Sequence, residues 1–371
     1  MRAAQPEASR RHGVGRVTVA AVLASISLTL ACAGSAAFPA RAHGFAKAIW
    51  GPLTYRGVNQ FPMYRQLGVS IEQIALNWND VAPTQPAAPA DPADPAYRWP
   101  ATVQATIRAA AASHMRVLLQ LINAPAWADG GHSGDGWAPL RASDFVAFAR
   151  AAALRYPTVR LWMVWGEPTK YRNFRPMPPG SPGQHISPRQ RAAAQLYAQM
   201  VDGVYGALKR QSRHNLVIGG CTYTTGSLDT LSWIRSMRLR SGRPPRMDMY
   251  AHNPFSYQAP RFSGPPSPFG EVQFSDLHRL AGWIDTNLHR GLPLFLSEFT
   301  IPTGPDKEFN FWVDPPLAGQ WLTDALRLAR RWHRIYALGW VNVYDELPRT
   351  AGGLLSANGM RKPTWYAFKR G

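Results

Sequence analysis

The feature that most constrains the fold is an alternation of short apolar segments with longer amphipathic ones along residues 43–371. The apolar segments have the length of strands and cover residues 46–50, 71–78, 116–122, 159–165, 216–221, 247–252, 292–298 and 336–343. The amphipathic segments have helical periodicity and cover residues 101–113, 143–155, 188–210, 228–238, 275–289 and 317–334. Eight strand-then-helix units predict an α/β fold, a (β/α)8 TIM barrel. A doubly wound open sheet is the competing fold, but no Gly-rich phosphate-binding fingerprint follows the first strand.

The first 42 residues have the pattern of an export signal rather than of a folded element. Arginines at positions 2, 10, 11 and 16 precede an apolar run over residues 17–33, and Ala40-Arg41-Ala42 forms a small-x-small cleavage site. A membrane anchor is the alternative, but the uninterrupted apolar run is shorter than the roughly 20 residues of a span. Cys32 after Leu30-Ala31 hints at a lipoprotein, although the leucine is one place from its usual position. We therefore expect a signal peptide over residues 1–42, a secreted protein without a stable membrane span, and one catalytic domain over residues 43–371.

The composition restricts the classes of partner. Apolar residues make up 46% of the chain and charged residues 17%, which excludes a disordered protein. Lys plus Arg number 41 against 22 Asp plus Glu, a net charge of +19. This charge suits an acidic polysaccharide, a cell-wall surface or nucleic acid, and it also fits a plain bias toward arginine, alanine and proline. Because no basic block or nucleic-acid motif occurs, we expect no nucleic acid and a monomer that binds carbohydrate.

Two glutamates stand where predicted strands end. The segment 159–165 runs into Gly166-Glu167-Pro168, and the segment 292–298 ends in Glu298. In a barrel of this kind, side chains at the carboxyl ends of the strands lie in the mouth, where active sites form. Two carboxylates facing each other across the mouth can hydrolyse a glycosidic bond, because one protonates the leaving oxygen while the other attacks the sugar. The alternative is that each carboxylate only pairs with an arginine.

The residues around both glutamates carry a family resemblance. Trp165-Gly166-Glu167-Pro168 resembles the Trp-Asn-Glu-Pro motif of clan A retaining glycoside hydrolases, and Leu296-Ser297-Glu298-Phe299 resembles their nucleophile motif. The resemblance covers residues 45–368 and is closest to families 39 and 5. Further stretches that resemble the clan are Leu76-Asn77-Trp78, Asp248 with His252-Asn253-Pro254-Phe255, Gly339-Trp340, and the tail from Gly353 to Trp365.

The resemblance implies roles for particular residues. Glu167 would be the acid/base and Glu298 the nucleophile, with His252 or Tyr250 orienting the nucleophile. Trp340 would be the sugar platform, and Trp78 is the next candidate, because an aromatic ring stacks well on the C–H face of a sugar.

Two positions depart from the family pattern. Gly166 stands where the family has an asparagine that binds the sugar 2-hydroxyl, and Gln73 stands where many members have an arginine. Asn123 and Asn253 are candidates for replacement sugar contacts.

Other chemistries lack support. The ten histidines show no His-x-x-x-His or Cys/His spacing, so we expect no metal and no cofactor. No Gly-x-Ser-x-Gly elbow of a serine hydrolase is present. The sequence predicts a secreted retaining glycoside hydrolase acting on a poly- or oligosaccharide, with an inactive glycan-binding barrel as the alternative.

Overall fold

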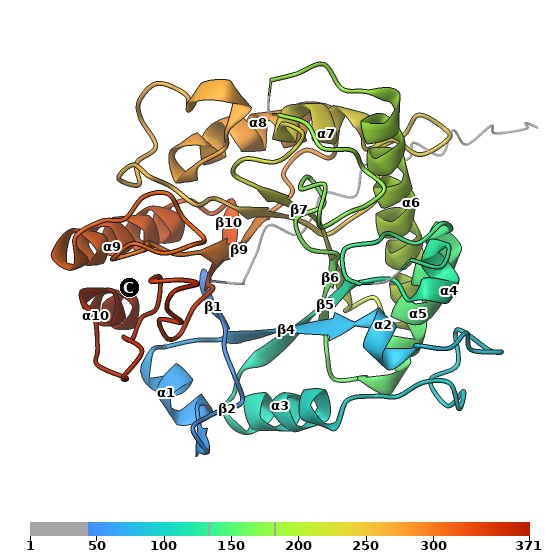
Figure 1. The fold of residues 1–371 in the computed structure, drawn as a ribbon, viewed down its shortest axis with the longest axis horizontal. Coiled ribbons are helices and arrows are strands. Elements are labelled where there is room, and N and C mark those ends of the chain that lie inside the picture. Colours follow the sequence, from blue (N-terminus) through green and yellow to red (C-terminus); the bar gives the residue numbers. More distant parts are fainter. Residues whose placement is uncertain (1–43, 133, 182) are drawn as a thin grey trace, which may run out of the picture. The chain divides into compact units, whose positions relative to one another are not determined.

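A computed structural model describes residues 44–132, 134–181 and 183–371. The predicted signal peptide lies outside these residues. The central element is a closed barrel of eight parallel strands, in which β1 pairs with both β4 and β10 (Figure 1). The strands are β1 Ala46–Trp50, β4 Ile71–Asn77, β5 Arg116–Ile122, β6 Leu161–Val164, β7 Leu216–Tyr223, β8 Met249–Asn253, β9 Leu294–Phe299 and β10 Ile335–Trp340. The predicted (β/α)8 barrel is therefore confirmed, and all eight strands lie where the sequence placed them.

Helices surround the barrel and connect successive strands (Figure 1). They are α1 Phe61–Gln66, α2 Trp78–Val81, α3 Ala101–Ala112, α4 Ala126–Asp129, α5 Ala142–Arg155, α6 Pro188–Gln211, α7 Thr230–Ser236, α8 Leu277–Asn287, α9 Pro315–Arg331 and α10 Pro363–Arg370. Two 3-10 turns, Pro268–Gly270 and Phe274–Asp276, precede α8, and a small hairpin pairs β2 Thr54–Tyr55 with β3 Val58–Asn59. Across the part of the chain described, no helix combines the length and apolar character that crossing a membrane requires.

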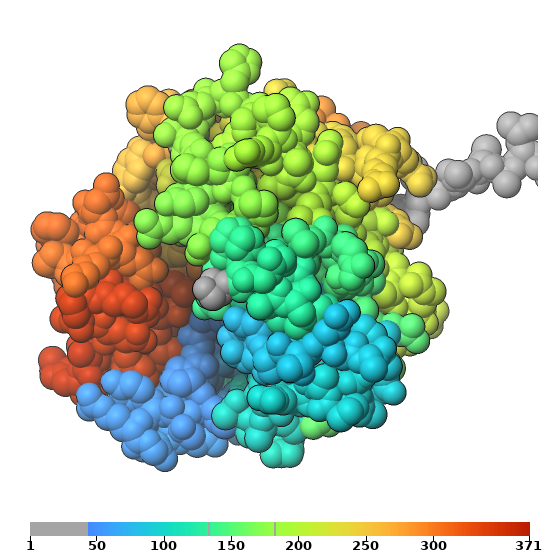
Figure 2. Space-filling view, turned by 45° about the vertical axis from the view of Figure 1, so that its right-hand side comes forward, coloured from blue at the N-terminus to red at the C-terminus, as the bar shows by residue number. Residues whose placement is uncertain are grey.

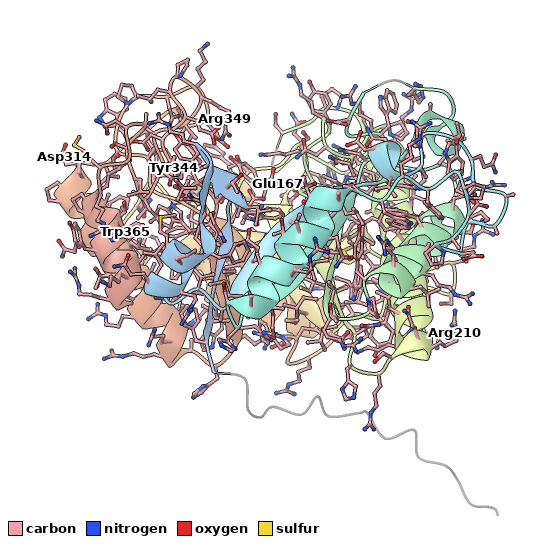
Figure 3. The ribbon with its side chains drawn as sticks, turned by 90° about the horizontal axis from the view of Figure 1, so that it is seen from below. Glu167, Arg210, Asp314, Tyr344, Arg349 and Trp365 are labelled. Carbon is pink, nitrogen blue, oxygen red and sulfur yellow. The ribbon has the colours of Figure 1, made fainter. Side chains whose placement is uncertain are left out.

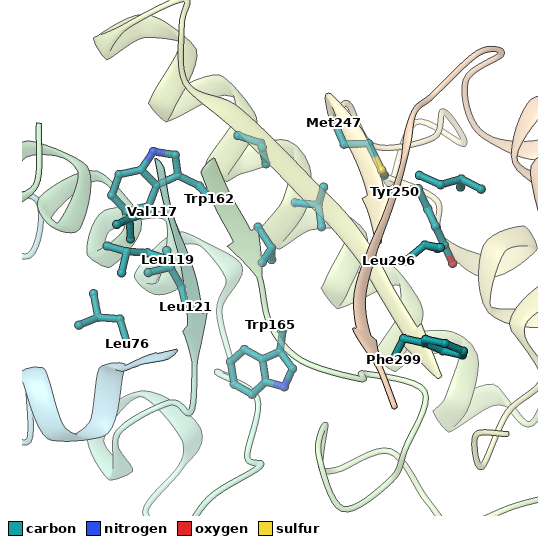
Figure 4. Packing of buried hydrophobic residues seen from close by; sticks show 14 of the residues in the cluster. Leu76, Val117, Leu119, Leu121, Trp162, Trp165, Met247, Tyr250, Leu296 and Phe299 are labelled. Atoms are coloured by element: carbon teal, nitrogen blue, oxygen red, sulfur yellow. The ribbon is translucent and has the colours of Figure 1, made fainter. Parts of the chain in front are cut away.

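Alternation along the strands divides the core into two layers. Side chains such as Met249 and Ala251 of β8 fill the barrel interior. Tyr250, between them, points outward into the larger layer beneath the helices, together with Leu119 of β5 and Leu296 of β9 (Figure 4). Because successive side chains of a strand point to opposite faces, this parity decides which residues can reach the mouth.

The ionisable side chain of a β4 residue lies within this packing. Glu72 of β4 is fully buried and takes part in none of the ion pairs formed by the described residues. Burial raises the pKa of its carboxyl well above the usual value, and the nearby backbone of Gly51 opposes this shift only in part. Burial of Glu72 therefore favours the protonated form of its carboxyl in the folded protein.

We expect Glu72→Gln to stabilise the protein increasingly as the pH rises. The unfolded chain releases this proton near the ordinary glutamate pKa, whereas the folded protein keeps it until the pH passes the raised folded pKa. Between these two pKa values the wild type loses up to about 1.4 kcal/mol of stability per pH unit, and the amide has no such loss. Urea unfolding of both proteins at about pH 5 and about pH 7 measures the difference. The control is Glu346→Gln, at an exposed glutamate, and equal pH dependence in wild type and Glu72→Gln would contradict the expectation.

Candidate active site

Glu167 follows β6 in a sharp turn that aims its side chain into the barrel mouth. Trp165 and Glu167, on either side of Gly166, have left-handed φ values of 65° and 44°. Such conformations cost about 1–3 kcal/mol each and are concentrated at functional sites. Figure 3 shows Glu167 at the end of the barrel toward which the strand arrows point. Figure 2 shows the surface hollowed where the orange and red C-terminal segment faces the green and teal loops.

Gly166 stands at a close approach. A Cβ at this position would lie 3.1 Å from Nε2 of Gln120. The side chain of Gln120 therefore occupies space that the asparagine of the Trp-Asn-Glu-Pro motif would need. Gln120 itself lines the same pocket as Glu167.

Three side chains hold the Glu167 carboxylate. Asn253 Nδ2 donates to Oε1 at 2.9 Å and Asn173 Nδ2 donates to Oε2 at 3.2 Å. The ammonium of Lys170 lies 2.6 Å from Oε2 and 3.4 Å from the centroid of the Tyr223 ring. An ammonium at this distance favours the negatively charged form of a carboxylate.

Glu298 reaches the mouth through an irregularity in β9. β10 pairs Leu338 with Leu296 and then Trp340 with Phe299, so β9 holds one extra residue at this point. A bulge of this kind interrupts strict alternation. Leu296 and Phe299 consequently both face the outer layer, while Glu298 lines the pocket that contains Glu167.

The two glutamates share one pocket of about 390 Å³ and one connecting residue. Asn253 donates to the Glu167 carboxylate, and its Oδ1 accepts from the backbone N–H of Glu298 at 3.2 Å. Burial and then the charge of Glu167 raise the pKa of Glu298 to about 8, against the opposing charge of Lys170. Two carboxyl groups that repel in this way release their protons as a coupled pair.

The residues predicted to bind sugar divide into two groups. Asn123 lines the pocket; it donates from Nδ2 to Asn77 at 2.8 Å and accepts from the Gly136 N–H at 3.1 Å. Asn253 is fully buried, so its observed contacts are with the glutamates rather than with the pocket space.

Gln73, one of the departures from the family pattern, exchanges hydrogen bonds of 3.0 Å with Ser297 and so supports the residue before Glu298.

The two predicted aromatic platforms are corrected by the structure. Trp340 is fully buried, donates from Nε1 to the Gly352 carbonyl at 3.1 Å and lies edge-on to Phe299. Trp78 is also buried, stacked on Phe148 at 5.3 Å beneath the helices. Neither ring presents a face on which a sugar could stack.

The two residues expected to orient Glu298 are also engaged elsewhere. Tyr250 faces the outer layer and its hydroxyl donates to Thr222 at 3.3 Å. His252 has both ring nitrogens occupied, by the Thr222 hydroxyl and by the Val272 carbonyl, each at 2.8 Å. Burial lowers the pKa of His252 to about 4, so the ring is neutral. The prediction that these residues serve the substrate or the nucleophile was wrong; both are parts of the packing around β7 and β8.

Lys170 and Asn173 are site residues that the sequence analysis missed. They lie three and six positions after Glu167 in the loop that follows β6. The spacing Glu-x-x-Lys is a signal in the sequence, but it does not show which loop cation turns back toward the mouth. No group of His, Cys, Asp and Glu among the described residues is arranged to hold a metal ion.

We expect the pH profile of any hydrolysis to end on its alkaline side near pH 8, where the pair loses its last proton and the pKa of Glu298 lies. Lys170→Met should move this limb to higher pH by about 1 unit, because removal of a neighbouring cation raises the pKa of a carboxyl. Initial rates across the pH range measure both limbs. An alkaline limb that stays in place in Lys170→Met would show that Lys170 does not act on the pair.

Comparisons with known proteins give structural matches only. No protein-family model and no curated protein matches the sequence. A family 39 glycoside hydrolase from Bacteroides cellulosilyticus WH2 has a TM-score of 0.60 and 16% identity, covering 89% of this chain and 63% of that chain. A monomeric beta-xylosidase from Caulobacter crescentus CB15 has a TM-score of 0.60 and 18% identity, covering 89% of this chain and 69% of that one. The GH39 enzyme from Xanthomonas axonopodis pv. citri has a TM-score of 0.59 and 17% identity, covering 88% and 65%.

The barrel has the fold of family 39 glycoside hydrolases. The fold implied by the family resemblance is thus confirmed. The chain spans less than two thirds of the length of the Bacteroides and Xanthomonas proteins. At these identities the likeness concerns the fold, and the activity has to be argued from the site.

Proposed function

We propose that the protein is a retaining glycoside hydrolase that cleaves O-glycosidic bonds of a poly- or oligosaccharide. The observation that carries the proposal is the common pocket of Glu167 and Glu298 at the carboxyl ends of β6 and β9, with Asn253 touching both residues. Active sites of such barrels lie at this face, and two carboxyl groups are the machinery of glycoside hydrolysis. The structural neighbours named as beta-xylosidase and glucosidase support the same chemistry.

The proposed mechanism is a double displacement. Glu298 attacks the anomeric carbon while Glu167 protonates the departing oxygen, which gives a glycosyl-enzyme on Glu298 and a free leaving group. Glu167 then takes a proton from water, the water attacks the anomeric carbon, and the sugar leaves with net retention. Asn253 positions both groups, and Asn173 orients the carboxyl of Glu167.

The reactive form carries the shared proton on Glu167. In the free protein Lys170 lies 2.6 Å from the Glu167 carboxylate, and burial followed by neighbouring charge raises the pKa of Glu298. Substrate contacts that draw Lys170 away from Glu167 would free this carboxyl to serve the leaving oxygen. The same ion pair is the observation that favours the second candidate function, a barrel that binds glycans without turnover.

The proposal also covers the cellular location and the oligomeric state of the protein. The sequence of residues 1–42 supports export through a signal peptide, so the enzyme would act outside the cell as a monomer, with the lipid-anchored form on Cys32 less favoured. Without residues 1–42, which hold five Arg and one Glu, the chain has a net charge of +15, which suits acidic and cell-wall polysaccharides as substrates.

Hydrolysis assays test the proposal. A panel of cell-wall polysaccharides and exopolysaccharides is incubated with wild type and with Glu298→Gln, and proton NMR follows the anomeric configuration of the first product. Release of sugar with retention by the wild type alone supports the hydrolase. Binding by both proteins without release by either would establish the non-catalytic barrel.

A further inference from the structure

The pocket that holds the two glutamates is also lined by two arginines. Arg172 and Arg175 come from the loop after β6 that supplies Lys170 and Asn173. In the described part of the chain, neither guanidinium lies within ion-pair distance of a carboxylate. Lys170 differs in this respect, because its charge is met by Glu167.

Arg175 is held in place by groups that leave its charge unneutralised. Its Nη2 donates to the backbone carbonyl of Asp135 at 3.1 Å, and its guanidinium lies 5.1 Å from the centroid of the Trp137 ring. Its Nε is buried and has no hydrogen-bond partner. Because this nitrogen is closed to solvent, a ligand would reach the guanidinium through its terminal nitrogens.

The backbone around the arginines is tightly packed. Arg175 N donates to Gly136 O at 2.7 Å, and Ala138 N donates to Arg175 O at 2.8 Å. A Cβ on Gly136 would lie 2.0 Å from the carbonyl oxygen of Arg172, and the φ of +80° also requires glycine there. The loop after β5 therefore packs tightly against the loop after β6, and these contacts fix the backbone positions of both arginines.

One further charge lines the pocket beside the arginines, and it is negative. The carboxylate of Asp135, which also lines the pocket, accepts from Asn79 Nδ2 at 3.1 Å. Arg172 is exposed, and its Nε donates to the Tyr171 hydroxyl at 3.0 Å, while its terminal nitrogens have no hydrogen-bond acceptor among the described residues. Guanidinium groups match the geometry of carboxylate and sulfate oxygens and bind them through paired hydrogen bonds.

We infer that this pocket binds a glycan whose sugar on the leaving-group side carries an anionic group, a carboxylate or a sulfate. The assignment to the leaving-group side rests on the proposed function, in which Glu167 protonates the leaving oxygen, because both arginines belong to the loop of Glu167. The anion accepts hydrogen bonds from Arg175 and Arg172. It also provides an alternative partner for the ammonium of Lys170, which otherwise lies 2.6 Å from the Glu167 carboxylate.

Binding measurements in the Glu298→Gln background, in which turnover is suppressed, test the inference. The probes are oligogalacturonate, its carboxyl-reduced neutral counterpart, a sulfated galactan oligosaccharide and a xylo-oligosaccharide. We expect at least one anionic probe to bind at least about ten-fold more tightly than the neutral probes. Arg175→Gln should weaken the binding of that anionic probe about ten-fold. The carboxylated and sulfated probes distinguish the two anions, and rising salt should weaken only anionic binding.

Two further variants complete the design. Arg172→Gln changes an exposed side chain and should weaken anionic probes selectively, even if Arg175→Gln proves unstable. Arg108→Gln removes the same charge from the exposed surface of α3 and should leave all affinities unchanged. Equal binding of anionic and neutral probes, no binding of any anionic probe, or equal losses for both classes in the pocket variants would overturn the inference.

The hydrolysis assay separates this inference from the proposed function. Cleavage of neutral glycans without any preference for anionic ones would overturn the anion site and leave the hydrolase intact. Arginine-dependent binding of an anionic probe, without release of sugar from any glycan, would overturn the hydrolase and support the anion site.

Discussion

Glu298→Gln is expected to lower glycoside hydrolysis by roughly five orders of magnitude or more, since loss of a nucleophile removes the covalent route entirely. The amide has nearly the volume of the carboxyl group and cannot attack the anomeric carbon. The backbone N–H of Glu298, which donates to Asn253, is unaffected by the change. Folding and glycan binding should therefore persist, and initial rates together with direct binding measurements show whether the loss lies in the chemical step.

A neighbouring carboxylate supplies the control. Glu308 contributes to the electrostatic field at Glu298 but pairs with Arg349 and is partly exposed. Glu308→Gln should keep activity within about ten-fold of wild type, as expected for a remote change of one charge. Comparable losses in the two variants would mean that charge near the pocket, rather than attack by Glu298, limits the reaction.

The fold was predictable because its signal is spread over the whole chain. Each strand of the barrel is buried on both faces and reads as a short apolar run, and helical periodicity separates these runs. The glutamates were predictable for a related reason, since Glu167 and Glu298 each stand where an apolar run ends. Neither inference needs the direction of an individual side chain.

The predictions of aromatic platforms were wrong because they depend on the direction in which each side chain points. On β10, Ala337 faces the barrel interior, whereas Leu338 and Trp340 belong to the outer layer. Alternation along the strand thus carries Trp340 away from the mouth. The extra residue in β9 has the opposite effect for Glu298, and nothing in the local sequence marks that bulge. The face of β10 on which Trp340 lies could have been counted from the sequence. Only the pairing between strands, however, shows where the alternation of faces is interrupted, as it is in β9.

The partners of Glu167 were harder to predict because they come from different parts of the chain. Asn253 reaches the carboxylate from the end of β8, 86 positions away, whereas Lys170 and Asn173 come from the adjacent loop. Many loop residues have the chemistry to serve in this way. The choice among them is made by the path of the loop, which the left-handed residues at its start and the contacts with Gly136 determine.

Glu167→Ala should have a different outcome, which depends on the leaving group. A substrate with an activated aryl leaving group needs no protonation, so its first step should survive in this variant. The second step should slow by about 10²–10⁴-fold, because no base remains to activate water. The glycosyl-enzyme on Glu298 should then accumulate, visible as a burst of released phenol and as an added sugar mass on the intact protein.

Azide distinguishes a missing base from a damaged site. It attacks the glycosyl-enzyme without needing deprotonation, so it should restore turnover in Glu167→Ala and yield a glycosyl azide of retained configuration. The same addition should not restore a retained product in Glu298→Gln, which forms no glycosyl-enzyme. If the roles of the two residues are exchanged, accumulation and rescue would appear in the alanine variant of Glu298 instead. Losses of equal size at both positions that azide cannot relieve would contradict the assignment, because a base and a nucleophile fail at different steps of the reaction.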